Sequence, residues 1–400
     1  MSRISPGTDL IARSLRRRVA LLAVIVAFSY LALEAIFSTL YVYGWVRHPE
    51  PFWVSEDSGR TVQFDPILGY RLTPTPSRVA KISFGAVEFQ ALLRGNNLGF
   101  VDKNDFTARA QGAGVKRIAV MGDSFTAASY LQADWTEAIE HLSRSAGQPL
   151  EVLNFAIAGA GLANWWSVIT RLLEPQDYQF DGLVFAVFEG DLHRGFSVSD
   201  HRGYREHHFG RAPSWNPAEW PRTLDEARPL LMPLRGFILS PPEFEQALAG
   251  RWSPPDPAPP WRPYAALKIG ELLGGMAAWL EGKKEESPAV VTLPDLNAEQ
   301  IRLIQDIAAY AQRHHLPVLV ASIPGRESLL AGLAPPADVR EFAKLLGADF
   351  IDGGQAFAGL TAREIRASWL PYDGHWGQVG SDRFAALIWR ALQRQEALKP

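Results

Sequence analysis

The feature that most constrains the fold is a run of apolar residues, LVFAVF, from Leu183 to Phe188. A strand with one solvated face alternates apolar and polar residues. A strand inside a parallel sheet is covered by helices on both faces and is apolar throughout. The run therefore predicts an inner strand of a parallel sheet.

Short apolar segments of this kind alternate with helix-length stretches along much of the chain. The expected strands are residues 117–121, 151–155, 183–188, 318–323 and 350–352. The expected helices are a stretch running from the first strand to residue 145, then residues 164–173, 297–314, 337–346 and 380–396. Strand–helix alternation in short units predicts an α/β fold with a central parallel sheet wrapped by helices.

The N-terminal region has the pattern of a membrane anchor. An arginine cluster precedes apolar residues from Val19 that continue past Glu34, and an aromatic group follows: Arg13, Arg16, Arg17 and Arg18, then Tyr41, Tyr43 and Trp45. A helix needs about 20 apolar residues to cross a bilayer, and basic residues stay in the cytoplasm. We expect a single-pass anchor with the rest of the chain outside the cytoplasmic membrane. A cleaved signal peptide with an apolar core from Val19 to Leu33 is the alternative, although no small-x-small site follows it. A buried helix of a soluble protein is a third interpretation.

The remaining sequence suggests a segmented organisation. The expected parts are a basic tail at 1–18, the anchor at 19–45, a membrane-proximal segment of short strands and turns at 46–115, an α/β domain at 116–196 and 295–400, and an insertion at 197–294. Between Pro213 and Pro263 lie 13 of the 29 prolines, too many for a regular sheet or a long helix. We expect the tryptophans of this insertion to fill a small core or to stack on sugar rings: Trp215, Trp220, Trp252 and Trp261.

Composition excludes several classes of protein. With 40 Lys and Arg against 43 Asp and Glu, the net charge is −3, which argues against a nucleic-acid-binding protein. A hydrophobic content of 47% excludes global disorder. The absence of cysteine removes thiol nucleophiles, disulfides and cysteine-ligated metals.

A candidate nucleophile follows the first strand. Gly122-Asp123-Ser124 places a serine just past the C-terminal end of that strand, where open α/β sheets bind ligands. Backbone N–H groups at the start of the next helix can stabilise an oxyanion. The alternative is that Ser124 only caps the helix.

A candidate base and its partner lie far downstream, before the last helix. In Asp373-Gly374-His375-Trp376, the histidine suits the activation of a serine, and Asp373 is placed to fix its tautomer. An ordinary surface loop, or two ligands of a metal site, are the alternatives. A second group at the start of the insertion suits a metal site or a solvated loop: Asp200, His201, Glu206, His207 and His208.

These motifs, in this order, resemble the SGNH (GDSL) hydrolase superfamily. Asn154 to Gly159 resembles its second block, and Asp181 to Asp191 resembles its third strand and the block that follows. The resemblance implies a three-layer, flavodoxin-like fold, a catalytic set of Ser124, His375 and Asp373, and an oxyanion hole formed by the backbone N–H groups of Ser124 and Gly159. Leu68-Gly69-Tyr70 and Asn97 to Phe100, with the anchor, are similar to a membrane-bound subgroup of bacterial exopolysaccharide systems, and Asp-x-His-Trp is similar to alginate acetylation enzymes.

The chain departs from the family at one position. Where the family carries an asparagine that holds the oxyanion, this sequence reads Glu189-Gly190-Asp191. Loss of one such donor costs about two to three powers of ten in rate. Gly190, His193 or a side chain of the insertion is expected to fill the position, or the enzyme is slow.

The resemblance implies a serine-dependent ester hydrolase that acts on an acylated carbohydrate outside the cytoplasmic membrane of a bacterium. The first alternative is a polysaccharide O-acetyltransferase that works with a membrane-bound acyl-donating partner. The second is a glycan-binding or assembly scaffold without turnover. No cofactor, metal or nucleic acid is expected, and the sequence leaves the acyl group and the sugar open.

Overall fold

The computed structural model describes residues 6–42, 51–83, 86–110, 112, 114–202, 209–233, 236–252, 254 and 295–395. The chain divides into two compact units. The first contains helix α1, and the second comprises residues 51–252 and 287–400.

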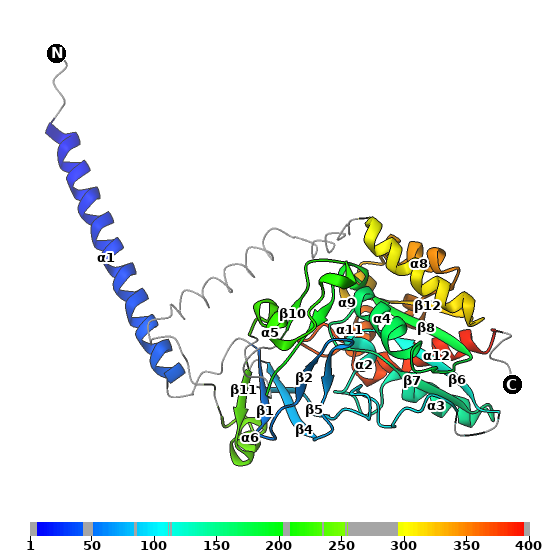
Figure 1. Ribbon diagram of the computed structural model, residues 1–400. Helices are drawn as coiled ribbons and strands as arrows, with labels where there is room; N and C mark the ends of the chain where they lie inside the picture. The colour runs from blue at the N-terminus through cyan, green and yellow to red at the C-terminus, as the bar shows by residue number, and fades with distance from the viewer. Residues whose placement is uncertain are drawn as a thin grey trace. The chain divides into compact units, whose positions relative to one another are not determined.

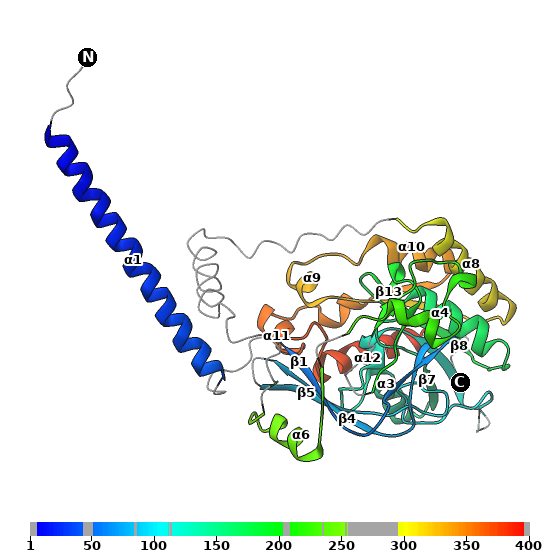
Figure 2. The same ribbon diagram turned by 60° about the vertical axis from the view of Figure 1, so that its left-hand side comes forward.

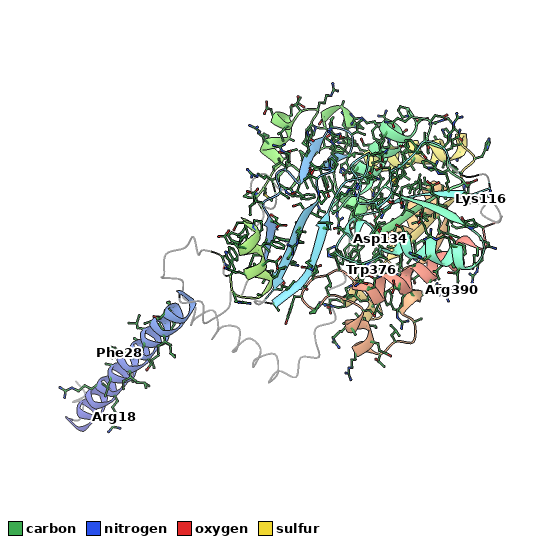
Figure 3. All side chains as sticks on the ribbon, turned by 90° about the horizontal axis from the view of Figure 1, so that it is seen from below. Arg18, Phe28, Lys116, Asp134, Trp376 and Arg390 are labelled. Carbon is green, nitrogen blue, oxygen red and sulfur yellow. The ribbon has the colours of Figure 1, made fainter. Side chains whose placement is uncertain are left out.

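Helix α1, Pro6–Val42, is long and apolar (Figure 1). Its segment Arg17–Ile36 has 20 residues and a mean hydropathy of 2.4, with no part of it buried. Phe28, for example, is 74% exposed (Figure 3). At 1.5 Å per residue this segment is long enough to cross a bilayer, and a signal sequence has the same length and composition. Of the expected aromatic group, Tyr43, Trp45 and the side chain of Tyr41 lie outside the described residues.

The second unit is built on a five-stranded parallel sheet, as the sequence predicts. Its order is β13-β12-β8-β6-β7. The strands are β6 Lys116–Met121, β7 Leu150–Asn154, β8 Gly182–Phe188, β12 Val318–Ile323 and β13 Asp349–Asp352. In chain order this is the 2-1-3-4-5 arrangement of flavodoxin-like folds. The order reverses between β6 and β8, which is where such sheets bind their ligands.

Helices cover both faces of this sheet and give three layers. In β6, Ile118 and Val120 pack with α3, Trp135–Ser145, and α12, Gln378–Leu392. Ala119 and Met121 point to the other face, which is covered by α4 Leu162–Val168, α8 Ala298–Arg313 and α10 Ala337–Leu346. Figure 1 shows α8 and α3 on opposite sides of the sheet. The fully apolar strands are thus explained by burial on both sides.

The helix expected to run to residue 145 is instead two helices. A four-residue helix, α2 Ser124–Ala127, ends where Ala128 has φ +23°, a left-handed conformation. The chain restarts at α3, where the Asp134 side chain accepts the backbone N–H groups of Thr136 and Glu137. Helix α4 continues into a π-helical turn, η1 Ile169–Leu173. The remaining predicted helices agree with the structure to within four residues at either end.

A second, four-stranded sheet of order β11-β1-β4-β5 belongs to the same unit. Strands β1 Phe52–Glu56, β4 Ser77–Ser83 and β5 Ala86–Leu93 come from the membrane-proximal segment. The edge strand β11, Gly236–Leu239, comes from the proline-rich insertion and pairs in parallel with β1. The proline-rich stretch thus contributes one short edge strand to this sheet, at Gly236–Leu239, a segment that carries no proline.

The other described elements are short. They are β2 Val62–Asp65, β3 Gly69–Leu72, β9 Ser197–Val198, β10 Gly210–Arg211, α5 Leu224–Ala227, α6 Pro241–Leu248, α9 Arg326–Leu330 and α11 Ala362–Ala367, with 3₁₀ turns at Asp191–His193, Pro217–Glu219, Arg228–Leu230 and Gly353–Phe357. Figure 2 shows α6 beside β1 and β4.

The tryptophans of the insertion that the structure describes pack against protein. Trp220 is 2% exposed and stacks on Phe196, with ring centroids 4.6 Å apart. Trp252 contacts the rings of Phe52 and Phe237. Trp220 therefore fills the core of this region rather than offering a face to a sugar. Trp261 lies outside the described residues.

Candidate active site

Ser124 lies where β6 gives way to α2, beside the point at which the strand order reverses. Asp123 caps α2, since its Oδ1 accepts the backbone N–H of Phe125 at 2.9 Å. Capping is thus done by Asp123, which leaves the Ser124 hydroxyl available for another contact. Oγ of Ser124 lies 2.7 Å from Nε2 of His375.

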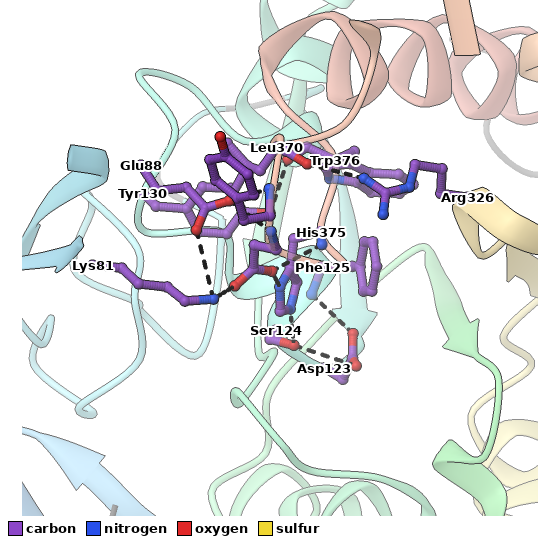
Figure 4. Close-up of polar contacts among 12 residues, drawn as sticks. Lys81, Glu88, Asp123, Ser124, Phe125, Tyr130, Arg326, Leu370, His375 and Trp376 are labelled. Carbon is purple, nitrogen blue, oxygen red and sulfur yellow. Dashed lines mark hydrogen bonds and ion pairs between the residues drawn. The ribbon is translucent and has the colours of Figure 1, made fainter. Parts of the chain in front are cut away.

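His375 connects Ser124 to Asp373 in a continuous chain of hydrogen bonds (Figure 4). Its Nδ1 is bonded to Oδ1 of Asp373, and that oxygen also accepts the backbone N–H of His375 at 2.9 Å. The loop closes on itself through the backbone bond from Leu370 N–H to the His375 carbonyl, 2.9 Å long. The structure therefore brings together the three catalytic residues predicted from the sequence, although Ser124 and His375 are 251 positions apart.

Aromatic rings fix the position of the imidazole. Phe125 lies 4.6 Å from the His375 ring, centroid to centroid, and Tyr130 lies 5.7 Å away in a T-shaped contact. The Tyr130 hydroxyl donates to the carbonyl of Trp376 at 3.2 Å. Trp376 itself is fully buried. Packing of this kind limits the rotamers open to His375.

Two residues of the second sheet complete the surroundings of Asp373, and sequence reasoning missed both. Nζ of Lys81, on β4, is bonded to Oδ2 of Asp373. Oε1 of Glu88, on β5, accepts the backbone N–H groups of Tyr372 and Asp373, at 2.7 and 2.6 Å. Figure 4 shows Lys81 reaching the cluster from the left, with Ser124 below His375. The sequence signal is a lysine in a mainly apolar and hydroxyl-bearing segment, and it does not identify a partner 292 residues away.

The electrostatics of this cluster favour a charged Asp373. Burial alone raises the pKa of its carboxyl, but the hydrogen bonds and charges of His375 and Lys81 outweigh burial, so its pKa lies well below the usual value. Burial and the negative charge of Asp373 raise the pKa of Tyr130 well above its usual value. The carboxylate is thus charged, and the phenol neutral, across the physiological range.

Gly159, the second predicted oxyanion donor, lies in the wall of the cavity next to Ser124. It lines the same cavity as Ser124 and His375, and its φ is +75°. A Cβ atom at this position would lie 2.7 Å from the ring of Phe209 and would be strained by the positive φ, and both favour glycine. The roles of the Ser124 and Gly159 N–H groups as oxyanion donors remain predictions.

The structure does not supply His193 as a replacement for the missing asparagine. Its Nε2 lies 3.0 Å from Asp338 and its Nδ1 lies 3.4 Å from Gln300, on the face covered by α8 and α10. Both ring nitrogens are therefore engaged away from Ser124. Gly190 has φ +83° and open space where a Cβ atom would lie, and its oxyanion role likewise remains a prediction.

Arg194 links the segment that follows β8 to Asp123, the residue before Ser124, and the sequence analysis did not predict this connection. Its Nη1 lies 2.6 Å from Oδ1 of Asp191 and 3.1 Å from Oδ2 of Asp123, and it also donates to the carbonyl of Ala160 at 3.0 Å. Both carboxylates are buried. Arg194 thus pairs with two buried carboxyl groups, one of them on the residue before Ser124.

A cavity of about 320 Å³ opens beside the Ser124 hydroxyl. Ser124, Asp373, His375 and Gly159 contribute to its wall, and much of the remaining wall is apolar. This volume is at the lower end of the range for small-molecule sites. The cavity gives a reacting carbonyl a place next to the nucleophile.

The structure describes only part of the Asp, Glu and His group at the start of the insertion, which the sequence analysis read as a metal site or a solvated loop. Asp200 accepts the guanidinium of Arg60 at 2.7 Å and the backbone N–H of Phe64 at 3.0 Å, which occupies Oδ1 with protein donors. Glu206, His207 and His208 lie outside the described residues. Within the ranges that the structure describes, no group of three or more His, Asp or Glu is arranged to hold a metal ion.

No protein-family model matches the sequence, and no curated protein does. Three solved structures illustrate the similarity. A lipase/acylhydrolase from Enterococcus faecalis is 10% identical, with a TM-score of 0.33, over 70% of this chain and 96% of that one. A lipase from a goat rumen metagenome is 10% identical, with a TM-score of 0.36, over 71% of this chain and all of the other. A two-domain esterase active on acetylated mannans is 11% identical, with a TM-score of 0.33, over 70% of this chain and 50% of that one.

Proposed function

We propose that this chain is a serine-dependent ester hydrolase with Ser124, His375 and Asp373 as its catalytic triad. The observation that carries the proposal is the 2.7 Å contact between Oγ of Ser124 and Nε2 of His375, with Asp373 bonded to the other ring nitrogen. This is the order of contacts by which a histidine activates a serine, on whatever fold it occurs.

In the first step, Oγ of Ser124 bonds to the ester carbonyl carbon while its proton passes to Nε2 of His375. The carbonyl electron pair moves onto oxygen, and Asp373 stabilises the imidazolium that forms. The bond between that carbon and the alcohol oxygen then breaks, and His375 returns the proton to the leaving alcohol. Water repeats the sequence on the acyl-enzyme and releases the acid, which restores the Ser124 hydroxyl.

The oxyanion of both tetrahedral intermediates is assigned to the backbone N–H groups of Ser124 and Gly159. Ser124 begins α2, where N–H groups lack partners within the helix. The positive φ of Gly159 and its place in the same cavity wall support its role as the second donor. Because glycine has no side-chain donor, Gly190 can serve as a third donor to the oxyanion only through its backbone N–H.

We further propose that α1 anchors the enzyme in the cytoplasmic membrane and that the second unit acts outside it on an acylated carbohydrate. The length and hydropathy of Arg17–Ile36, preceded by arginines, support the anchor. The carbohydrate rests on the sequence resemblance to exopolysaccharide-associated members of the SGNH superfamily.

The test is ester hydrolysis by the purified full-length protein. We expect Ser124→Ala and His375→Ala each to lower the rate on 4-nitrophenyl acetate and butyrate by at least about 10³-fold, with unchanged circular dichroism. Ser145→Ala, on the exposed end of α3, serves as the matched control. Hydrolysis by the wild type that survives Ser124→Ala, or a wild type inactive on every ester, contradicts the proposal, and the second result favours a glycan-binding scaffold.

Hydrolysis and transfer share the acyl-enzyme and differ in what attacks it. Supplying an activated ester with and without an oligosaccharide, and measuring both free acid and acylated sugar, separates the two. We expect free acid as the main product at every acceptor concentration. Acylated sugar as the main product makes the chain an O-acyltransferase, working with an acyl-donating partner in the membrane.

A further inference from the structure

The cavity beside Ser124 has an unusually apolar wall for a site that handles a sugar ester. Most of its lining is apolar and includes Trp53, Val62, Leu72, Val79, Phe89 and Phe209. Apart from Ser124, Asp373 and His375, its polar lining consists of Tyr70, Ser129, Tyr130, Ser199 and His201. A pyranose presents hydroxyl groups that need polar partners, because a buried unpaired hydroxyl is costly. A hydrocarbon chain needs none.

The second sheet builds much of this wall through the alternation of its strands. Phe52 and Val54 of β1, with Ala80 and Ile82 of β4, form a small core with α6. The intervening residues point the other way, so that Trp53 and Val79 line the cavity. Two-residue periodicity thus gives one sheet a structural face and a ligand-facing one.

Cross-strand contacts make this wall continuous. Val79 on β4 and Ala91 on β5 are directly paired, and both line the cavity. Trp53 lies against Phe89, with ring centroids 5.3 Å apart, and Phe89 lies 5.0 Å from Tyr130. Tyr130 in turn contacts the ring of His375. An apolar surface therefore leads from the catalytic histidine onto the second sheet.

We infer that this cavity binds the acyl chain of the substrate and that the preferred chain is of medium length, well beyond acetyl. The inference rests on the proposed function, because only an ester held at Ser124 places its acyl group here. A cavity of about 320 Å³ is several times larger than an acetyl group needs, since a group of the size of a water molecule or a methylene takes up ~30 Å³. We expect an optimum at about eight carbons.

The first measurement is kcat/KM on 4-nitrophenyl esters from acetate to dodecanoate, with the full-length protein in lipid nanodiscs, because detergent monomers compete for an apolar cavity. Each methylene removed from water strengthens binding about three- to fourfold. We expect kcat/KM to rise at least 100-fold from acetate to octanoate and to level off or fall by dodecanoate.

The second experiment uses variants with larger side chains, which narrow the cavity. Ala91→Phe places a ring in front of Val79 and should lower the octanoate-to-acetate ratio of kcat/KM at least tenfold. The matched control is Leu92→Phe, one residue further along β5, where the side chain is 58% exposed and the ratio should stay within twofold of the wild type. If Ala91→Phe does not fold, the milder Val79→Met should lower the ratio at least threefold.

The results separate this inference from the proposed function. Activity that depends on Ser124 but is highest on acetate and falls with chain length overturns the acyl-chain assignment and leaves the esterase intact. Equal losses on acetate and octanoate in both Ala91→Phe and Val79→Met also overturn it. Absence of any Ser124-dependent hydrolysis contradicts the proposed function itself.

Discussion

At the scale of single residues, the carboxylate of Asp373 is held from both sides. Both Nδ1 and the backbone N–H of His375 bond to Oδ1 of Asp373, while Nζ of Lys81 bonds to Oδ2. Glu88 fixes the backbone of the same loop and lies 3.8 Å from Nζ of Lys81. Lys81 does not touch the reacting atoms, so it is a positioning residue for Asp373.

Replacing Lys81 with Met should lower kcat about tenfold and leave KM nearly unchanged. The buried carboxylate loses a charged partner, its pKa rises, and it orients His375 less firmly in the transition state. Steady-state kinetics on an activated ester measures the split between kcat and KM. Lys81→Arg should recover most of the loss, and Lys344→Met, on the exposed face of α10, should have no effect. A rise in KM with kcat unchanged contradicts the positioning role.

Replacing Arg194 with Met should destabilise the protein by about 3 kcal/mol, because two buried carboxylates lose their common partner. Burial and the charge of Asp123 already raise the pKa of Asp191 well above its usual value, while Arg194 acts in the opposite direction. Urea unfolding of the variant and the wild type measures the difference. Arg313→Met, which breaks an exposed pair with Glu174, should cost less than about 1 kcal/mol. Equal losses in the two variants would show that burial of the Arg194 network is unimportant.

At the scale of secondary structure, the sequence predicts the five parallel strands well and the second sheet poorly. Strands such as β8 carry their own signal, since burial on both faces makes them apolar throughout. The pairing of β11 with β1 joins segments that are far apart in the chain, and the residue pattern of neither strand indicates which strand it pairs with. For the same reason Ser124, His375 and Asp373 were identifiable from motifs, whereas Lys81 and Glu88 were not. Their role depends on the register of β4 and β5, which includes a bulge at Lys81/Ile82.

Two buried carboxyl groups near the start of α3, those of Asp102 and Asp134, should make the stability of the protein depend on pH. Burial raises the pKa of Asp102 to about 7 and that of Asp134 to about 6, and their mutual repulsion adds to the effect at Asp102. Both pKa values lie above those of the unfolded chain, so the folded state binds more protons between about pH 4 and pH 7. The free energy of unfolding should therefore fall as the pH rises through this window.

Asp102→Asn tests this dependence. Asparagine carries no charge and keeps an oxygen for the backbone N–H of Asn104, and it gives up only the longer 3.4 Å contact with the backbone N–H of Asn154. We expect the variant to be more stable than the wild type by about 1–2 kcal/mol at pH 8 and no more stable at pH 5, as measured by urea unfolding. The control is Asp177→Asn, an exposed carboxylate on the same unit. A difference between variant and wild type that is the same at both pH values contradicts the assigned pKa.

At the scale of the whole molecule, the chain joins a long apolar helix to a unit that contains the complete triad and its cavity. Asp373, His375 and Ser124 all lie in residues 51–252 and 287–400, together with the sheet that lines the cavity. In the proposed function the helix contributes by location rather than by chemistry, because as an anchor it would determine on which side of the membrane the ester must be.

The orientation of the chain can be tested directly, because the protein contains no cysteine and introduced cysteines report alone. Thr75 is exposed on the catalytic unit, and Ser5 precedes the arginine cluster. Since basic residues hold the N-terminus in the cytoplasm, an impermeant thiol reagent should label Thr75→Cys in intact spheroplasts and leave Ser5→Cys unlabelled until the membrane is permeabilised. The mass of the purified protein should equal that of the whole chain. Labelling of Ser5→Cys alone reverses the orientation, and a mass that lacks the first residues through the apolar segment identifies a cleaved signal peptide instead of an anchor.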